Sequence, residues 1–596
     1  MNPSISRLLA TGFLFGLMQS LPAATIEVLS TDLAGVGFND TTPVSPVGGN
    51  DGITLGQQRI NVLQRAGEIW ADYLHSTVPI KVEAKFDDLG GSPDGYALAG
   101  ASAITVVRNF TNAPQANVWY PVALGNSLAG SDLSTSNDIR VTVNIAPDTD
   151  PALPSWYYGL DGNTPSNRTN LLDVLLHEIG HGLGFASFAD IQAGSFLQRT
   201  PDIYSLNLYD VEFGAGWGDL SKRNLQLSAK NDPDLTWSGT YSTIAAPYIL
   251  DNKLDLSVTA PASIAGTYTY EAAGFGPPVI AGDIVGGSLV VMLDDDDPFT
   301  DACGNITNAA AIDGNIAYID RGTCNFDAKV LAAQQAGAIA VIIANNVTGG
   351  PMLMGGNDVV EGVTLTIPAV AISLEDGALL TSESGVVVDL GVPSTTLAGS
   401  NAGFVRIYAP DPIEEGSSVS HWTTDASPDL LMEPFINPVF REDLDLSLTL
   451  LKDIGWVVID IPYPHLTYDL WVLEAFSPGA TLLAVGDDPD SDGVLNIEEY
   501  FFGGDPETPS VDTLPRLQRA GAGLDFTFIR ATTFTDLAIG YEISTDMTTW
   551  NPAVEGVDYT EEVISSVGTT AEQVQLKLTD IPPGEEVFVR LRIDLE

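Results

Sequence analysis

Residues 175–185 constrain this chain more than any other segment, because they place ionisable side chains inside an apolar run, Leu-Leu-His-Glu-Ile-Gly-His-Gly-Leu-Gly-Phe. On a helix, His177 and His181 would share one face, with their Cβ atoms about 5–6 Å apart. Two imidazoles so placed can hold one Zn²⁺, and Glu178 beside them can act on a metal-bound water as a general base. The alternative is a buried helix with two incidental histidines, but buried polar groups need partners, and a metal supplies one. The segment therefore predicts two ligands and the base of a zinc site.

The N-terminus has the pattern of a secretory signal. Residues 1–24 combine Arg7, an apolar run from Leu8 to Leu21 and a Pro-Ala-Ala end, which predicts cleavage after Ala23 or Ala24. We therefore expect a secreted or periplasmic protein. No later apolar run reaches the roughly 18–20 residues of a membrane helix, so we expect no integral membrane segment in the mature chain.

Charge and cysteine content narrow the partners and the redox compartment. The formal net charge of −54 argues against nucleic acid as a partner. It is explained by a solvated, self-repelling surface, by calcium binding at particular acidic clusters, or by both. Only two cysteines occur, Cys303 and Cys324, and in an exported chain they favour one disulfide over a free reactive pair. Nothing in the sequence decides the oligomeric state.

The order of predicted elements is that of an α/β protein, and 596 residues are too many for one compact domain. Strand patterns at 25–30, 79–86 and 138–145 alternate with a helix at 57–74 and with the histidine helix, which Thr169 or Asn170 can cap. Residues 138–144 form either an edge strand, on which an extended peptide could pair, or an internal strand. Between 255 and 392, a strand, helix and strand at 315–344 predict a βαβ unit in a separate domain.

A catalytic zinc usually has three protein ligands, so two histidines leave one ligand to be found. Gly184 lies three residues after His181, which resembles the metzincin proteases, where a glycine lets the chain leave the helix sharply and a third histidine follows three residues later. Here that later position is Ser187, a poor zinc ligand. Asp190 could substitute for it, whereas His75 and His465 have no distinguishing context. His421 is the better candidate because of the segment in which it lies.

That segment, residues 416–434, reads Gly-Ser-Ser-Val-Ser-His-Trp-Thr-Thr-Asp-Ala-Ser-Pro-Asp-Leu-Leu-Met-Glu-Pro and resembles the leishmanolysin-type metzincins. The resemblance implies that His421 is the third zinc ligand and that Met432 forms the methionine turn below the metal. It implies an α/β (α+β) catalytic domain split into residues 25–254 and 393–461, with a closing helix near 446–455. Unlike the usual member of that family, this chain is poor in cysteine, so a cysteine-switch latency is excluded.

The residues between the two halves resemble a protease-associated (PA) domain. The resemblance is carried by Gly314-Asn-Ile-Ala-Tyr-Ile-Asp-Arg-Gly-Thr-Cys-Asn-Phe-Asp-Ala-Lys329, by 336–345 and by Ile367-Pro-Ala-Val-Ala-Ile-Ser373. It implies that residues 255–392 are an inserted, usually non-catalytic domain, thought to steer substrates or cover a cleft. Both cysteines lie inside it.

A second metal motif lies near the C-terminus, in a linker that we place at residues 462–507. Asp488-Pro-Asp-Ser-Asp-Gly-Val-Leu-Asn-Ile-Glu-Glu499 satisfies the EF-hand-like pattern D-x-D-x-D-G-x₅-E. The expected ligands are the side chains of Asp488, Asp490, Asp492, Asn496 and Glu499 and the carbonyl of Val494. The alternative is a merely acidic linker. We expect a structural Ca²⁺ there, followed by a C-terminal β-sandwich at residues 508–596.

These observations predict a secreted zinc-dependent endopeptidase that hydrolyses protein or peptide substrates with zinc-activated water and Glu178 as the base. The alternative is a non-catalytic exported adhesion or binding protein with PA and β domains and a structural or vestigial metal site. The intact Glu178 favours the enzyme, because a purely structural zinc site has no need of a base.

Overall fold

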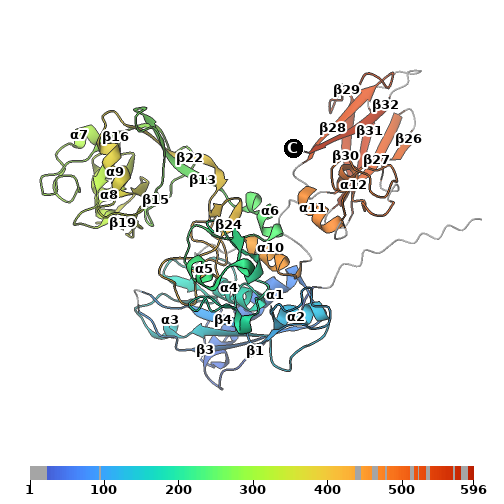
Figure 1. The fold of residues 1–596 in the computed structure, drawn as a ribbon, viewed down its shortest axis with the longest axis horizontal. Coiled ribbons are helices and arrows are strands. Elements are labelled where there is room, and N and C mark those ends of the chain that lie inside the picture. The colour runs from blue at the N-terminus through green and yellow to red at the C-terminus, as the bar shows by residue number, and fades with distance from the viewer. Residues whose placement is uncertain are drawn as a thin grey trace, which may run out of the picture. The chain divides into compact units, whose positions relative to one another are not determined.

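The computed structural model of the protein describes residues 23–92, 95–435, 444–458, 468–476, 480–509, 514, 516–520, 523–531, 537–567, 571–578 and 588–595. Its chain forms two compact units (Figure 1). The first contains the described residues up to Ile249, then Val405–Trp422 and those from Leu430 onward, and the second contains Leu250–Phe404 and Thr423–Asp429. Residues 1–22 of the predicted signal lie outside the described residues, as does His465.

The N-terminal part of the first unit is built on a four-stranded sheet in the order β1-β3-β7-β4. Strands β1 (Ile26–Ser30), β3 (Ile80–Asp87) and β7 (Ile139–Asn144) are parallel, and β4 (Ala99–Ala103) runs antiparallel to β7. Of the two interpretations of residues 138–144, the structure supports the internal strand. Strand β7 pairs with β3 on one side and β4 on the other, so its main chain has no open edge.

Two helices pack on this sheet, and each approaches it through a glycine. Helix α1 (Leu55–Tyr73) passes β1 at Gly67, where a Cβ atom would lie 3.1 Å from Ile26. Helix α4 (Leu171–Leu183) passes β7 at Gly182, where a Cβ atom would lie 2.2 Å from Ile139. The helices also contact each other, because the Trp70 indole N–H donates to the Leu176 carbonyl over 3.0 Å. The predicted helices and strands of this region are therefore present, with small shifts of their ends.

The rest of the first unit that lies near the histidines is irregular. It includes helix α2 (Val122–Ala129), the short strands β8 (Ser155–Tyr157) and β9 (Arg168–Asn170), helix α6 (Thr240–Ile249), strand β24 (Phe404–Arg406) and helix α10 (Asp445–Asp453). Helix α10 occupies the position predicted for a closing helix. The indole N–H of Trp456, just beyond it, donates to the Leu183 carbonyl at the end of α4 over 2.9 Å.

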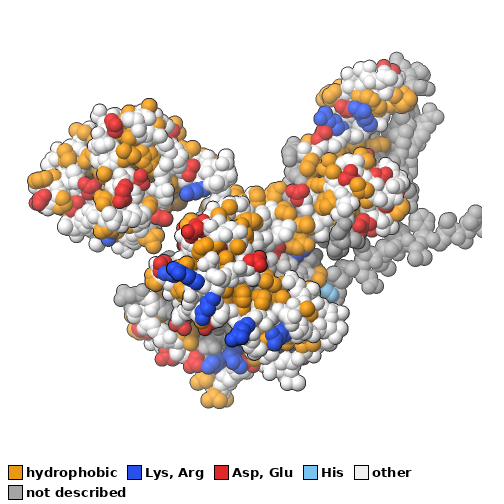
Figure 2. Space-filling model, in the orientation of Figure 1, with side chains coloured by type: hydrophobic (Ala, Val, Ile, Leu, Met, Phe, Trp, Pro, Cys, Tyr) orange, Lys and Arg blue, Asp and Glu red, His pale blue; other side chains and the backbone are white. Residues whose placement is uncertain are grey.

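The second unit contains an eight-stranded mixed sheet in the order β14-β13-β22-β16-β17-β18-β21-β15. Its strands include β13 (Asn252–Ala260), β14 (Gly266–Tyr268), β15 (Glu271–Ala272), β16 (Ile284–Val291), β21 (Ala369–Ile372) and β22 (Val387–Leu397). The predicted βαβ unit is present as β17 (Ile316–Asp320), α8 (Phe326–Gln335) and β18 (Ala340–Ala344), and the two strands pair in parallel. Cys303 and Cys324 form the predicted disulfide, with their Cα atoms 5.7 Å apart. Residues 250–404 carry 18 acidic and three basic side chains, and acidic groups are scattered over the visible face of this unit (Figure 2).

The C-terminal part of the chain has two short helices and two antiparallel sheets. Helices α11 (Tyr468–Ala475) and α12 (Asn496–Phe502) precede a four-stranded sheet, β26-β27-β31-β30, and a three-stranded sheet, β29-β28-β32. The two shorter strands are β26 (Arg516–Ala520) and β29 (Asn551–Pro552). The principal strands of the sheets are β27 (Gly523–Ala531), β28 (Leu537–Ser544), β30 (Tyr559–Val567), β31 (Ala571–Leu578) and β32 (Phe588–Leu595). Phe528, Tyr541 and Val574 belong to one buried cluster shared by the two sheets. Within the described part of the chain, no helix is long and apolar enough to cross a membrane.

Candidate metal centre

Helix α4 is fixed at both ends by residues that suit those positions. The Asn170 side chain caps its N-terminus by accepting a hydrogen bond from the Leu172 amide over 3.0 Å. At the other end Gly184 has φ +133°, and a Cβ atom there would lie 2.6 Å from Ile454 Cδ1. Only glycine fits such a backbone and such a close approach. The chain therefore leaves the helix sharply after His181, as the sequence predicted.

The structure brings His177 and His181 together with His421. The His177 and His181 Nε2 atoms lie 3.0 Å apart, and the His421 Nε2 atom lies 3.2 Å from each of them. A tetrahedral zinc with Zn–N bonds of about 2.05 Å separates its ligand nitrogens by about 3.3 Å. The three nitrogens therefore have nearly the spacing of three corners of a zinc tetrahedron, which leaves the fourth corner for water or substrate.

The opposite nitrogen of each imidazole is held by a backbone carbonyl. Nδ1 of His177 lies 2.8 Å from the Leu431 oxygen, Nδ1 of His181 lies 2.8 Å from the Phe185 oxygen, and Nδ1 of His421 lies 2.7 Å from the Ser417 oxygen. A carbonyl can only accept, so each Nδ1 carries the proton and each Nε2 presents its lone pair. Such anchoring of the non-ligating nitrogen is the usual second layer of a metal site.

Burial keeps these imidazoles neutral. It lowers the pKa of His177 to about 3 and that of His181 to about 4, and for His177 the charge of His181 lowers the pKa further. Burial, together with His181 and His177, holds the pKa of His421 well below its ordinary value. Neutral imidazole is the form that binds metals, so the electrostatics of the site suit a cation.

Glu178 is the acidic residue that directly follows His177 on α4. Its side chain is buried, and its Oε2 atom has no hydrogen-bond partner. Burial raises the pKa of this carboxyl to about 8. A nearby cation would favour the charged form, so a buried acid beside three neutral imidazoles fits a bound metal and its water.

Met432 lies against the helix from the side of His421. It is fully buried, and its Sδ atom lies 2.7 Å from the point that a Cβ atom on Gly180 would occupy. Its carbonyl accepts a hydrogen bond from the Trp422 amide over 2.9 Å. The Leu431 amide donates to Asp445 Oδ2 over 2.5 Å, while the Leu431 carbonyl holds His177. The turn at Leu431–Met432 therefore connects the third histidine, the first histidine and helix α10.

The other candidate ligands lie elsewhere. The Ser187 hydroxyl pairs with that of Ser205 over 2.8 Å. Asp190 is exposed, and its carboxylate caps the Ala193 amide over 2.7 Å. His75 belongs to the short strand β2 (Leu74–His75) and is not part of the histidine group. Among the described residues, Ser187, Asp190 and His75 do not lie in one group with His177 and His181, whereas His421 does.

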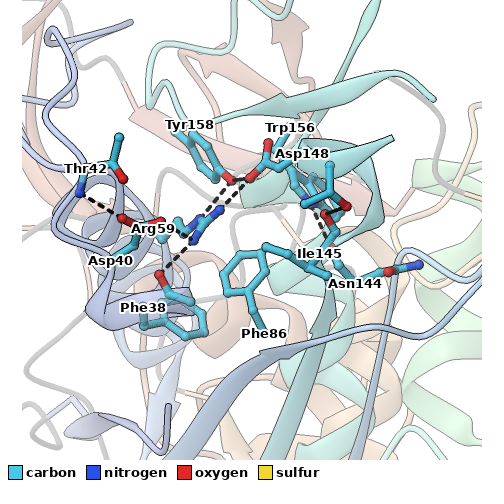
Figure 3. Close-up of polar contacts among 12 residues, drawn as sticks. Phe38, Asp40, Thr42, Arg59, Phe86, Asn144, Ile145, Asp148, Trp156 and Tyr158 are labelled. Atoms are coloured by element: carbon cyan, nitrogen blue, oxygen red, sulfur yellow. Dashed lines mark hydrogen bonds and ion pairs between the residues drawn. The ribbon is translucent and has the colours of Figure 1, made fainter. Parts of the chain in front are cut away.

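The sequence did not predict a buried polar network that supports helix α4 (Figure 3). Arg59, on α1, is fully buried and donates to the Tyr158 hydroxyl over 3.0 Å, to the Gly37 carbonyl over 2.7 Å and to Asp148 Oδ2 over 2.6 Å. The Tyr158 hydroxyl also donates to Asp148, and the guanidinium lies 4.3 Å above the Phe86 ring. Tyr158 directly follows β8, which pairs with β9 and so positions the Asn170 cap of α4.

A second residue that the sequence analysis did not single out is Asp173, one turn before His177 on the same face of α4. Its side chain is buried and its Oδ1 atom has no hydrogen-bond partner. Burial raises the pKa of this carboxyl to about 7. The spacing of four residues from His177 was the signal that could have drawn attention to it.

The predicted calcium loop is folded around its acidic residues. Carboxylate oxygens of Asp488, Asp490 and Asp492 lie within 4.8 Å of one another. Gly493 has φ +90°, and the Gly493 amide donates to Asp488 Oδ2 over 3.0 Å. Asn496 and Glu499 are buried in helix α12, and Val494 lies between the loop and that helix. The structure thus brings together the three aspartates of the predicted ligand set.

The match to a protein-family model lies in the second unit. Residues 285–380 match the model of the PA domain. The chain is 32% identical over 120 residues to Vacuolar-sorting receptor 4 of Arabidopsis thaliana, covering 19% of each chain, and 52% identical over 42 residues to the PRADC1-like protein of Drosophila melanogaster, covering 7% of this chain and 21% of that protein. The chain thus spans about a fifth of the length of these relatives.

Solved structures give partial matches. The zinc aminopeptidase BSAP from Bacillus subtilis is 26% identical, with 26% of this chain and 37% of that chain covered and a TM-score of 0.17. The aminopeptidase from Aneurinibacillus sp. strain AM-1 is 23% identical, with 24% and 31% covered and the same TM-score. The presence of a PA domain is established by the family match at residues 285–380.

Proposed function

We propose that the protein is a secreted zinc endopeptidase of the metzincin type, in which His177, His181 and His421 hold one Zn²⁺ and Glu178 is the general base. The observation that supports this most is the convergence of three Nε2 atoms at 3.0–3.2 Å while every Nδ1 is bound to a backbone carbonyl. A structural zinc site tends to have four protein ligands, whereas this one offers three and a buried acid.

The residues divide the work of peptide hydrolysis. When bound, Zn²⁺ supplies Lewis acidity that polarises the scissile carbonyl and lowers the pKa of a water towards 7. Glu178 lies on the same helix as two of the ligands, and its Oε2 is free of other hydrogen bonds. It can therefore accept the proton of the attacking water and pass it to the departing amine. The carbonyls of Phe185, Ser417 and Leu431 hold the imidazoles in the productive tautomer.

Strand β4 supplies a reason to favour an endopeptidase. Among the described strands it has one hydrogen-bonded neighbour, β7, and helix α4 packs along it. An extended peptide can pair with such an edge through main-chain hydrogen bonds, with neither of its termini required. Proteins and internal peptide bonds are therefore the expected substrates.

Two further parts of the sequence interpretation belong to this proposal. The signal pattern of residues 1–24 and the Cys303–Cys324 disulfide support export to an oxidising compartment. The arrangement of Gly184 and Met432 around the histidines supports the metzincin type. The alternative function is that of a non-catalytic binding protein. It is favoured by the similarity to relatives that are named as sorting receptors.

The test uses the purified full-length chain, its zinc content and its cleavage of casein. We expect one zinc per chain and cleavage that a chelator abolishes. Glu178→Gln should keep the zinc and lose about 10²–10⁴-fold in kcat. The matched control is Glu68→Gln, an exposed residue of α1, which should cleave at the wild-type rate. Unchanged cleavage in Glu178→Gln would refute the catalytic assignment, and bound zinc without any cleavage would favour the binding protein.

A further inference from the structure

The acidic loop near the C-terminus has an arrangement that its own hydrogen bonds do not satisfy. Asp488 accepts hydrogen bonds from the Asp492 and Gly493 amides, and Asp492 accepts one from the Val494 amide. The three carboxylates nevertheless stay within 4.8 Å of one another, where their negative charges repel. In addition, the Asp490 Oδ2 atom is buried without a hydrogen-bond partner.

A buried amide provides independent evidence for a ligand. Asn496 is fully buried, and its Nδ2 donates to the carbonyls of Leu482 over 3.1 Å and Ala484 over 2.9 Å. Its Oδ1 has no hydrogen-bond partner. Glu499, one turn further along α12, is 1% exposed. The groups gathered here are oxygen acceptors with an excess of negative charge, and a hard divalent cation satisfies such a set better than any protein donor.

The helix that carries these two residues also anchors the C-terminal sheets. Tyr500 packs against Tyr468 and Trp471, with ring centroids 5.6 Å and 5.5 Å away. Phe501 and Phe502 enter the core of the two sheets, where their ring centroids lie 6.0 Å and 6.1 Å from that of Phe528. Helix α12, of seven residues, thus joins the acidic loop to the core of the two C-terminal sheets; we call the loop, the helix and the sheets the C-terminal module. A helix this short has little stability of its own. It therefore depends on its contacts with the aromatic core and with the acidic loop.

We propose that the loop at residues 488–499 binds one Ca²⁺ and that the bound ion fastens α12 into the core of the C-terminal sheets, making the folding of residues 480–596 calcium-dependent. The ligands are Asp488, Asp490, Asp492, the Val494 carbonyl, Asn496 and Glu499. Because the ion binds the folded module and not the unfolded one, it stabilises the module by mass action. This inference is independent of the zinc proposal, since no zinc ligand belongs to these residues.

The experiment measures Ca²⁺ binding by calorimetry and limited trypsin digestion of the full-length chain, with 1,10-phenanthroline present during digestion to silence any zinc-dependent cleavage. We expect one Ca²⁺ per chain. At a Ca²⁺ concentration about 100 times the Kd, the open population of the module should fall about 100-fold, and cleavage within residues 480–596 should slow by the same factor. Fragments that end at Arg516, Arg519 or Arg530, the first tryptic sites after Lys452, should accumulate when Ca²⁺ is withdrawn.

Two variants sharpen the result. Glu499→Gln should lose the calcium dependence, whereas Glu498→Gln, whose carboxylate caps the Leu495 amide over 2.8 Å, should keep it. The wild-type comparison with and without Ca²⁺ decides the matter even if Glu499→Gln fails to fold. Absence of bound Ca²⁺ in the wild type, or equal digestion with and without it, would overturn the proposal. Zinc content measured on the same samples reports separately on the other site.

Discussion

At the scale of single residues, the centre depends on a few positions where a change of one atom is decisive. Gly184 is the clearest, because it combines a left-handed backbone with a close approach to Ile454. The turn at Gly184 ends the helix just after His181 and brings the Phe185 carbonyl to His181 Nδ1. The geometry of the ligands is therefore set by a residue that makes no contact through a side chain.

Gly184→Ala should destabilise the protein by about 1–3 kcal/mol or more, because the added methyl group meets Ile454 and the backbone is strained. Zinc affinity should fall as well, since the Phe185 carbonyl that holds His181 follows directly. Urea unfolding and a zinc competition assay measure the two effects. Gly100→Ala is the control, since a Cβ atom there meets nothing within 4 Å. Equal stability of the two variants would argue against this role of Gly184.

The pKa of Glu178 predicts a pH dependence in the metal-free protein. Its pKa is about 8 in the folded protein and about 4.5 in the unfolded chain. The folded state therefore binds more protons than the unfolded state between pH 4.5 and 8, so this residue's contribution to stability falls as the pH rises through that range. Each unit of pKa corresponds to about 1.4 kcal/mol.

In urea unfolding of chelator-treated protein, Glu178→Gln should gain stability relative to wild type between pH 5 and pH 8. Adding zinc to the wild type should reduce that gain, because a bound cation favours the ionised carboxylate. A difference between the two proteins that does not change with pH would contradict the assigned burial.

At the scale of elements, the position of helix α4, which carries His177 and His181, depends on contacts that are remote from the histidines. The Arg59 network links α1 to Asp148 and Tyr158, and β8 and β9 carry that link to the cap of α4. Buried charges are costly when they lose a partner, so this network is sensitive to the removal of its cation.

Arg59→Met should lower the free energy of unfolding by about 3–5 kcal/mol, because it leaves the Asp148 carboxylate and the Tyr158 hydroxyl without the guanidinium. Arg65→Met on the same helix should change it by less than about 1 kcal/mol, since Arg65 forms an exposed pair with Glu68. Chemical denaturation of both variants tests this expectation. A small effect of Arg59→Met would show that the network contributes little.

Local patterns in the sequence predicted what depends on neighbours along the chain. Spacing along the chain predicted the pair His177 and His181 and the acidic loop, and the likeness to metzincin proteases predicted the turn at Gly184. The structure has the helix, the turn and the three clustered aspartates, while calcium binding stays a prediction. His421 is 240 residues beyond His181, and no periodicity connects them; only the resemblance of its segment to a known family identified it. Strand β4 lies at the edge of the sheet and β7 lies inside it. The sequence of β7 could not show this, because it depends on which other strands pair with it. The Arg59 network had no local signal.

At the scale of the whole molecule, the chain interrupts its N-terminal fold with a unit that contains a PA domain and returns for His421 and Met432. The three histidines of the proposed zinc site therefore come from both flanking segments of the first unit. Folding and metal binding should be linked across this interruption, because a metal that binds the assembled site stabilises it.

The most direct test of the split zinc site is the zinc affinity of His421→Ala, measured by competition with a chromophoric chelator. We predict a loss of at least about 100-fold relative to wild type, with His75→Ala unchanged, because the third nitrogen is removed only in the first variant. Zinc bound by His421→Ala as tightly as by the wild type would contradict the account.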